Sequence, residues 1–376
     1  MKITARRVLL SNGFVSNCTI VVEDGVVKEV LPAKSGDVDC DTAVPGLIDQ
    51  HLHGGFGADV MRQSPEKLLE WLHFLLRNGE TQVLAGIYTS SRNDMRRALE
   101  NVRQVMRMQQ AGEGGAKVAG VHLEGPFISR HAPGAMLTAH ILPPNLAKWN
   151  LLTDGYEDII RMVTIAPEEE GALELIGYLR SQGIMVSAGH TTASAEEGRK
   201  AFAAGVDCVT HFFNASTPIH HRRPGILTEA LLDKRVFTEC ICDFVHVHPS
   251  AVRLIYHCKG AERMIVVSDA VFTTGLKDGT YSAEDEVSVV EGGISRTPEG
   301  ALMGGSLTQL QEVRNLISIG IPAEDAFYMA SQTPADYLRI SGGRIVPGAR
   351  AEILCLDDAL QPLCVVNGKE CVRGGN

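Results

Sequence analysis

The stretch Val121-His122-Leu123-Glu124-Gly125-Pro126-Phe127 decides how the rest of the chain is interpreted. Its alternating apolar residues are typical of a β-strand, and the strand ends at the Glu124 carboxylate because Gly-Pro turns the backbone. Barrel enzymes keep their chemistry at the carboxyl ends of such strands. A carboxylate there can ligate a metal, act as a base or cap a helix, so the role of Glu124 depends on how other strands end.

Eight short apolar runs of this kind alternate with helical segments along the middle of the chain. This alternation predicts a (β/α)8 TIM-like barrel over residues 44–342. A doubly wound open sheet is the alternative, but the sequence has no GxGxxG or P-loop motif to favour it. The predicted strands are residues 46–53, 82–88, 117–124, 161–166, 184–190, 207–214, 237–244 and 263–270. The clearest helical periodicity falls in residues 64–79, 92–110, 168–183 and 194–205.

Both ends of the chain are rich in β-strand signals instead. Asp24-Gly25 stands between β-branched runs, which is a strong hairpin signal, and a similar pattern fills residues 344–372. Each end alone is too small to bury much surface. We therefore expect one discontinuous β-sandwich domain made of residues 1–43 and 343–376. Repeated Gly turns in residues 271–303 predict a hairpin excursion, after which the helical ring resumes near Ser306.

The composition limits the class of protein. Of the 376 residues, 44% are hydrophobic, which supports a large core, and the net charge of −10 argues against a nucleic-acid surface. An anionic substrate would then need a local basic pocket. We find no signal peptide and no apolar run that could span a bilayer. The nine cysteines form no CxxC pair, and Cys240 and Cys242 alternate like packed strand residues, so we expect reduced thiols and a cytoplasmic location.

Several predicted strands end in metal-ligand chemistry. His51 and His53 are two residues apart on an extended strand, so their imidazoles point to the same face. One HxH pair, or one strand-end carboxylate, is more often structural than functional. In a barrel, however, all of these strand ends face the same opening, and His with carboxylate ligands suits zinc or a similar divalent ion. The strand-end residues are His51, His53, Glu124, His190, His211 and Asp269.

A divalent ion with an open coordination position lowers the pKa of bound water to about 7. A strand-eight carboxylate such as Asp269 can take the proton from that water and deliver it to a leaving nitrogen. The residues therefore indicate hydrolysis of an amide or an ester, or a deamination. The strand-end residues alone do not decide between these three reactions.

The motifs PGLIDQHLH, HLEGPFIS, SAGHT, THFFNA, SDA and LMGGSLT, in this order, resemble the amidohydrolase superfamily and, within it, the N-acetylglucosamine-6-phosphate deacetylase family. The similarity runs along nearly the whole chain. It implies that Glu124, His190 and His211 bind the main metal and that Asp269 is the general base and acid. His51 and His53 match a pair that binds a second metal in some members, with Glu124 bridging the two ions. Zinc is the expected metal, with iron, manganese or cobalt as alternatives.

The resemblance also places the substrate. Asn214 and Ala215 match residues that hold the sugar phosphate, and His246 matches a residue that contacts sugar hydroxyls. Arg222 belongs to the densest basic cluster of the chain and matches an arginine that reaches into the neighbouring subunit's site, which implies a homodimer. One position departs from the family: Met136 stands where a histidine is expected to polarise the substrate carbonyl, and Met cannot donate a hydrogen bond.

The resemblance implies a metal-dependent enzyme of amino-sugar catabolism that hydrolyses the acetamide of N-acetyl-D-glucosamine 6-phosphate to glucosamine 6-phosphate and acetate. A related substrate such as N-acetylgalactosamine 6-phosphate is the alternative. A cyclic amidase or deaminase of the same superfamily often uses a lysine on strand four, and none ends the run at residues 161–166. A non-catalytic barrel would be expected to lose ligands, yet this chain has them all.

Overall fold

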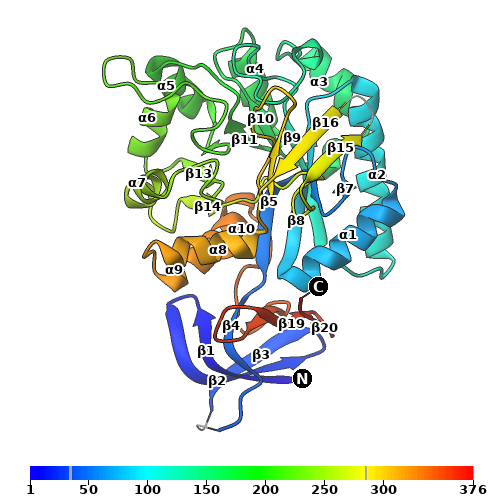
Figure 1. The fold of residues 1–376 in the computed structure, drawn as a ribbon, viewed down its shortest axis with the longest axis vertical. Coiled ribbons are helices and arrows are strands. Elements are labelled where there is room, and N and C mark those ends of the chain that lie inside the picture. Colours follow the sequence, from blue (N-terminus) through cyan, green and yellow to red (C-terminus); the bar gives the residue numbers. More distant parts are fainter. Residues whose placement is uncertain (34–35, 284–285, 376) are drawn as a thin grey trace.

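The computed structural model describes residues 1–33, 36–283 and 286–375. Its larger part is an eight-stranded parallel sheet in which each strand pairs with the next along the chain, in the order β14-β13-β12-β11-β10-β9-β8-β5. This sheet curves into the predicted (β/α)8 barrel (Figure 1). The strands are β5 (Leu47–Leu52), β8 (Glu80–Tyr88), β9 (Lys117–Glu124), β10 (Ile160–Ile165), β11 (Met185–Ala188), β12 (Cys208–Val209), β13 (Phe237–Cys240) and β14 (Met264–Val266).

All eight predicted strands are confirmed, but several end earlier than the sequence indicates. The run expected over 207–214 contains only a two-residue strand, β12, and the chain turns from Thr210 onward. Likewise β11 ends at Ala188 and β14 at Val266. The apolar character continues past these strand ends because the turns that follow are also buried. Hydrophobic periodicity reports burial, so it does not mark where the extended backbone stops.

The first and last strands of the barrel are joined by side chains. Gln309 donates from Nε2 to the carbonyl oxygens of Ile48 and Val266, 2.9 Å from each. Asp49, on β5, accepts the backbone N–H of Ser268 at 3.2 Å. In the part of the chain that the structure describes, β5 and β14 themselves form no backbone ladder. The barrel therefore closes on these buried side chains together with backbone hydrogen bonds between β5 and the turn after β14.

The helices form an outer layer around the barrel (Figure 1). The four helices with the clearest periodicity are confirmed within a few residues, and each begins or ends where the local chemistry indicates. Ser194 caps α5 with a reciprocal capping box, and Gly79 ends α1 in a left-handed conformation. The helices are α1 (Pro65–Asn78), α2 (Arg92–Gln110), α3 (Leu146–Thr153), α4 (Ala172–Ser181), α5 (Ala195–Ala204), α6 (Ile226–Leu232), α7 (Pro249–Lys259), α8 (Gln309–Ser318), α9 (Ala323–Met329) and α10 (Gln332–Leu338).

Both ends of the chain meet in one small β-domain below the barrel (Figure 1). Its seven-stranded sheet has the order β20-β19-β18-β4-β1-β2-β3, in which β4 joins the halves by pairing with β1 and β18. Asp24 and Gly25 form the predicted hairpin turn, with φ values of 50° and 80°. The strands are β1 (Lys2–Leu10), β2 (Gly13–Glu23), β3 (Val26–Pro32), β4 (Cys40–Pro45), β18 (Glu352–Leu356), β19 (Pro362–Asn367) and β20 (Glu370–Arg373).

The predicted excursion after β14 is also present. It is a three-stranded antiparallel sheet that crosses the front of the barrel in Figure 1. Its strands are β15 (Gly279–Ala283), β16 (Glu286–Glu291) and β17 (Ile294–Arg296). Two further short strands, β6 (Gly54–Gly55) and β7 (Ala58–Asp59), form a small hairpin after β5. All nine cysteines are free thiols. Within the described residues, none of the helices has the length and apolarity needed to cross a bilayer.

Candidate metal centre and active site

Glu124 is the last residue of β9, and its buried carboxylate touches four imidazoles. Its Oε1 atom lies 2.9 Å from His211 Nε2, 3.1 Å from His190 Nε2 and 3.4 Å from His51 Nε2. Its Oε2 atom lies 3.2 Å from His53 Nε2. The carboxylate therefore stands between two pairs of histidines, one at the end of β5 and one in the turns after β11 and β12.

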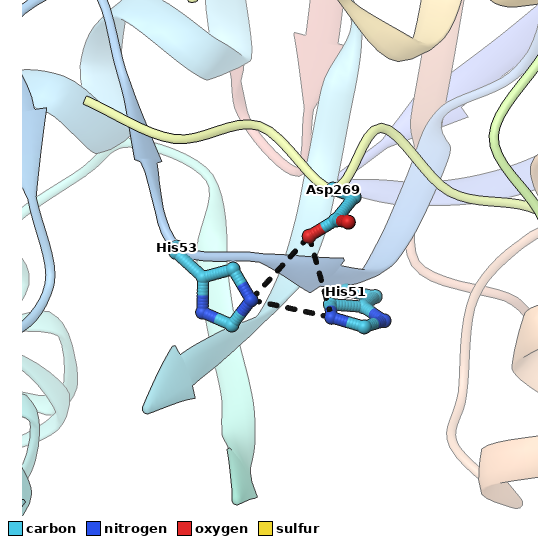
Figure 2. A group of neighbouring side chains, drawn as sticks. All are labelled: His51, His53 and Asp269. Carbon is cyan, nitrogen blue, oxygen red and sulfur yellow. Dashed lines mark hydrogen bonds and ion pairs between the residues drawn. The ribbon is translucent and has the colours of Figure 1, made fainter. Parts of the chain in front are cut away.

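His51, His53 and Asp269 converge as a compact triangle (Figure 2). The two imidazole Nε2 atoms are 3.2 Å apart, and Asp269 Oδ1 lies 3.4 Å from each. The pairing of the i and i+2 histidines on one face is the geometry predicted from the strand period. Asp269 reaches them because its backbone N–H donates to the carbonyl oxygen of His51 at 2.9 Å, which fixes the turn after β14 against β5.

The outer hydrogen bonds of two histidines show that this cluster is built for a cation. Glu239 Oε2 accepts from Nδ1 of His51 at 2.9 Å, and the carbonyl oxygen of Ala132 accepts from Nδ1 of His190 at 2.9 Å. When Nδ1 carries the proton, Nε2 of the neutral ring presents a lone pair. Both Nε2 lone pairs then face Glu124 oxygen at close range, which is repulsive unless a proton or a metal ion lies between them. This arrangement is typical of metal-binding histidines.

The distances fit a small divalent ion. Zinc binds nitrogen and oxygen at about 2.0–2.2 Å in a tetrahedron, so neighbouring ligand atoms lie about 3.3 Å apart. The contacts among Glu124, His190 and His211 are 2.9–3.1 Å, and those among His51, His53 and Asp269 are 3.2–3.4 Å. The residues present therefore suit one ion in each group, with Glu124 reaching both.

The charges of these groups stabilise one another. Burial alone would lower the pKa of His53, but hydrogen bonds with Asp269 and Glu124 raise it to about 9. Burial alone would raise the pKa of Glu124, yet the positive field of His51 and the bonds from His190 and His211 hold it well below its usual value. Each shift has the same cause: the carboxylates attract positive charge to the spot where the imidazole nitrogens meet.

Three of these side chains depend on an uncommon backbone conformation. His190, His211 and Asp269 have φ values of 48°, 28° and 47°, in the left-handed region that residues other than Gly rarely adopt. The sequence makes room for one of these turns at Gly189, where a Cβ atom would lie 2.7 Å from the Thr210 side chain. Strained positions of this kind concentrate at functional sites. They aim the side chains inward just beyond the strands.

The cluster opens into a cavity of about 340 Å³. Asn214, Ala215 and His246, which the sequence assigns to the substrate, line this cavity together with five of the six ligand-type residues. The sixth, His51, is fully buried behind them. Arg222 does not line the cavity of its own chain: it is exposed, and its Nη1 bonds to His221 Nε2 at 2.8 Å. The roles of Asn214, Ala215, His246 and Arg222 stay predictions, and the first three of these four residues line the cavity.

The loop after β9 forms another wall of the cavity. Met136 and His140 both line it, whereas His131 is exposed and does not. Arg130 holds the loop by donating to the carbonyl oxygens of Thr138 and Ile141, at 2.7 and 2.9 Å. His131 and His140 are the two histidines of this loop that could take over from the histidine expected at position 136, and only His140 lines the cavity.

Two polar side chains at the site, Glu239 and Arg62, are not indicated by the sequence. Glu239 is a carboxylate inside the buried strand β13, where it binds His51 and also accepts from Gln50 Nε2 at 2.7 Å. A charged residue within a strand of otherwise buried character was the available signal. Arg62 lines the cavity beside Asp59, and its Nη1 lies 2.9 Å from the Asp59 carboxylate. The segment after the HxH motif has no periodic pattern that would have indicated this.

Comparison with known proteins gives a consistent result. Residues 42–373 match the model of the amidohydrolase family. An N-acetylgalactosamine-6-phosphate deacetylase of Escherichia coli O157:H7 is 35% identical over 361 residues, which cover 95% of each chain. An N-acetylglucosamine-6-phosphate deacetylase of Vibrio furnissii is 33% identical, over 89% of this chain and 85% of its own.

Solved structures agree with the sequence relatives. A mutant N-acetyl-D-glucosamine-6-phosphate deacetylase of Mycobacterium smegmatis, in complex with N-acetyl-D-glucosamine-6-phosphate, superposes with a TM-score of 0.92 at 31% identity over 99% of both chains. The N-acetylglucosamine-6-phosphate deacetylase of Thermotoga maritima gives a TM-score of 0.90 at 31% identity, with both chains fully covered. The likeness extends over the barrel and the β-domain alike.

Proposed function

The chain belongs to the amidohydrolase family, and from that premise we propose that it removes the acetyl group from an N-acetylated hexosamine 6-phosphate. The observation that carries this proposal is the cluster of four histidines and two carboxylates at the base of one cavity. The relatives over nearly the whole chain are deacetylases of this substrate class. The products would be the free amino-sugar phosphate and acetate, as expected for a step of amino-sugar catabolism.

The family is metal-dependent, and we propose that Glu124, His190 and His211 hold the main ion. His51 and His53 would hold a second ion beside Asp269, with Glu124 shared between the two. Imidazole and carboxylate donors at these distances suit zinc, while iron, manganese and cobalt accept the same donors. A divalent ion bound here supplies a Lewis acid for the acetamide carbonyl and lowers the pKa of a water beside it.

Asp269 is the residue that we assign to proton transfer. Its carboxylate lines the cavity, and interactions with His51 and His53 overcome the effect of burial and keep its pKa below the usual value. An ionised carboxylate at this place can take the proton of the attacking water and return it to the amine nitrogen as the C–N bond breaks. The amine would otherwise leave as an unstable anion, so delivery of this proton is required for turnover.

The remaining predicted contacts concern the sugar phosphate. Asn214 and Ala215 line the cavity on the turn after β12, and His246 lines it on the turn after β13. Arg222 lies outside the cavity of its own chain, which is what a role in a neighbouring subunit's site requires. We therefore keep the homodimer as part of the proposal. The nine free thiols support a reducing compartment, and we propose a cytoplasmic location.

N-acetylgalactosamine 6-phosphate is the second candidate substrate. A specific observation favours it: the relative that is 35% identical over 361 residues is a deacetylase of that sugar, whereas the one from Vibrio furnissii acts on the glucosamine isomer. The two sugars differ only in the direction of one ring hydroxyl. The choice therefore depends on the polar groups that surround the ring.

Acetate release from a panel of N-acetylhexosamines tests the proposal. Purified protein should release acetate from the glucosamine or galactosamine 6-phosphate and much more slowly from the sugars without phosphate. A chelator should abolish the release, and added zinc should restore it. Metal analysis of the same sample should give about one or two divalent ions per chain. Activity on a cyclic amide with none on these phosphates would overturn the proposal in favour of a cyclic amidase.

A further inference from the structure

Asp243 follows β13 and makes a dense set of hydrogen bonds although its side chain is fully buried. Its Oδ1 atom accepts the backbone N–H groups of Val245 and His246 at 2.9 and 2.8 Å. Its Oδ2 atom accepts from His246 Nδ1 at 2.8 Å and from the Ser306 hydroxyl at 3.1 Å. The carboxylate therefore fixes both the turn and the ring of His246.

The carboxylate is ionised in this environment. Burial alone would raise the pKa of Asp243, but the hydrogen bonds from His246 Nδ1 and from the backbone N–H groups of Val245 and His246 hold it below its usual value. An ionised carboxylate only accepts hydrogen bonds. His246 must therefore place its proton on Nδ1 to satisfy this contact. In the neutral ring that choice leaves Nε2 as an acceptor with no proton.

The Nε2 atom is the part of His246 that remains for a ligand. His246 lines the catalytic cavity, and among the described residues no hydrogen-bond partner is recorded for its Nε2. An acceptor at this place discriminates between the parts of an amino-sugar phosphate. The phosphate and the acetamide carbonyl only accept hydrogen bonds, whereas the ring hydroxyls and the acetamide N–H can donate. The acetamide has to lie at the metal centre for hydrolysis, so we take a ring hydroxyl as the group that His246 binds.

We propose that Asp243 is a positioning residue that holds His246 as a hydrogen-bond acceptor for one ring hydroxyl of the substrate. The inference rests on the proposed substrate class. It adds the residue that decides whether His246 accepts or donates the hydrogen bond to the substrate. Asp243 touches no substrate atom itself. It acts through His246 alone, which separates its role from that of Asp269 at the metal centre.

The substitution Asp243→Asn tests this with almost no change of shape. Asn keeps an oxygen for the N–H groups of Val245 and His246, but it places an amide NH2 where Oδ2 faces the ring. That NH2 donates to Nδ1, so the proton of His246 moves to Nε2 and the acceptor becomes a donor. Nitrogen-15 spectra of histidine-labelled protein at pH 8 report the tautomer directly, and a His246→Ala sample assigns the signals.

We expect the wild-type ring to carry its proton on Nδ1 and the Asp243→Asn ring to carry it on Nε2. The kcat/KM for the hexosamine phosphate should fall about tenfold, mainly through KM, as for the loss of one hydrogen bond. Substrate analogues that each lack one ring hydroxyl identify the contact. Wild type and Asp243→Asn should have equal kcat/KM for the analogue that lacks the hydroxyl bound by His246. If Asp243 acts only through the ring of His246, the double variant Asp243→Asn with His246→Ala should have the same kcat/KM as His246→Ala alone.

The matched control is Asp207→Asn, which changes a carboxylate paired with Arg180 at 2.9 Å and outside the lining of the cavity. It should leave kcat/KM unchanged. A wild-type ring protonated on Nε2, or an unchanged kcat/KM in Asp243→Asn despite the tautomer change, would overturn the inference. Failure of the proposed function looks different: no hexosamine phosphate would release acetate with wild type, while the tautomer spectra would stay as expected.

Discussion

The two groups of metal-type ligands differ in how the chain builds them. His51 lies on β5 and His53 directly follows that strand, and the two meet because alternate residues of an extended backbone share a face. Glu124, His190 and His211 come from three places, and both histidines lie in left-handed turns beyond their strands. The two histidines of the first group are thus brought together by local geometry, whereas Asp269 and all three residues of the second group reach their places only once the barrel has formed.

Their outer support differs as well. The carboxylate of Glu239 backs His51, while a backbone carbonyl, that of Ala132, backs His190. A charged partner makes the imidazole a stronger electron donor than a neutral one does. In each group the second histidine, His53 or His211, has a buried Nδ1 atom without a hydrogen-bond partner in the described residues. Each group therefore has one firmly oriented ligand and one that relies on the metal for its orientation.

The largest expected effect comes from Asp269→Asn. Loss of the proton-transferring carboxylate should lower kcat by about 10²–10⁴-fold, as is typical for general acid–base catalysis. The group of Glu124, His190 and His211 does not include Asp269, so its ion should be retained. Steady-state kinetics with metal analysis of the same sample measures both quantities. Activity near that of wild type would show that another residue transfers the proton.

The next effect compares the two groups directly through His53→Ala and His190→Ala. His53→Ala should remove only the ion of the first group, so that the metal content falls to about one ion per chain and part of the activity remains. His190→Ala should remove the main ion and nearly all activity. Metal analysis with acetate-release assays checks both variants. Equal metal content in the two variants would mean that the groups do not bind separately.

A smaller effect is expected from Glu239→Gln. This change keeps the shape of the side chain but removes the charge behind His51, so the affinity of the first group for its ion should fall about 10–100-fold. Competition with a chromophoric chelator measures that affinity. Asp207→Asn is again a suitable control because its carboxylate pairs with Arg180 away from the cavity. If Glu239→Gln instead lowered the metal affinity of the group of Glu124, His190 and His211, the assignment of Glu239 as the support of His51 would be wrong.

The same contrast explains what the sequence could predict. The His51–His53 pair and the Glu124 strand end follow from strand period and turn chemistry, and the alternation of apolar runs with helices predicts the barrel. The early ends of β11 and β12, which place His190 and His211 in turns, could not be seen because the buried character continues past them. Glu239 and Asp243 act through other side chains, so only the packed structure brings them to the site.

The smallest expected effect concerns Met136, which lines the cavity where a carbonyl-polarising histidine is expected. If the ion at His51 and His53 already polarises the acetamide carbonyl, Met136→His should leave kcat unchanged or raise it slightly, since a second donor adds little to a Lewis acid. Ala139→His places the same residue in the same loop outside the lining of the cavity, so it controls for effects on the loop.

His140→Ala completes this test because His140 lines the same wall and its imidazole can donate a hydrogen bond there. If the metal polarises the carbonyl, His140→Ala in the wild-type chain should change kcat only a few-fold. In a chain that already carries His53→Ala, the same substitution should lower kcat much more. A large loss in His140→Ala, fully restored by adding Met136→His, would instead assign the polarising role to His140. The ion at His51 and His53 would then have a role in orienting Asp269 and Glu124, and the difference between the two groups would be one of structure more than of chemistry.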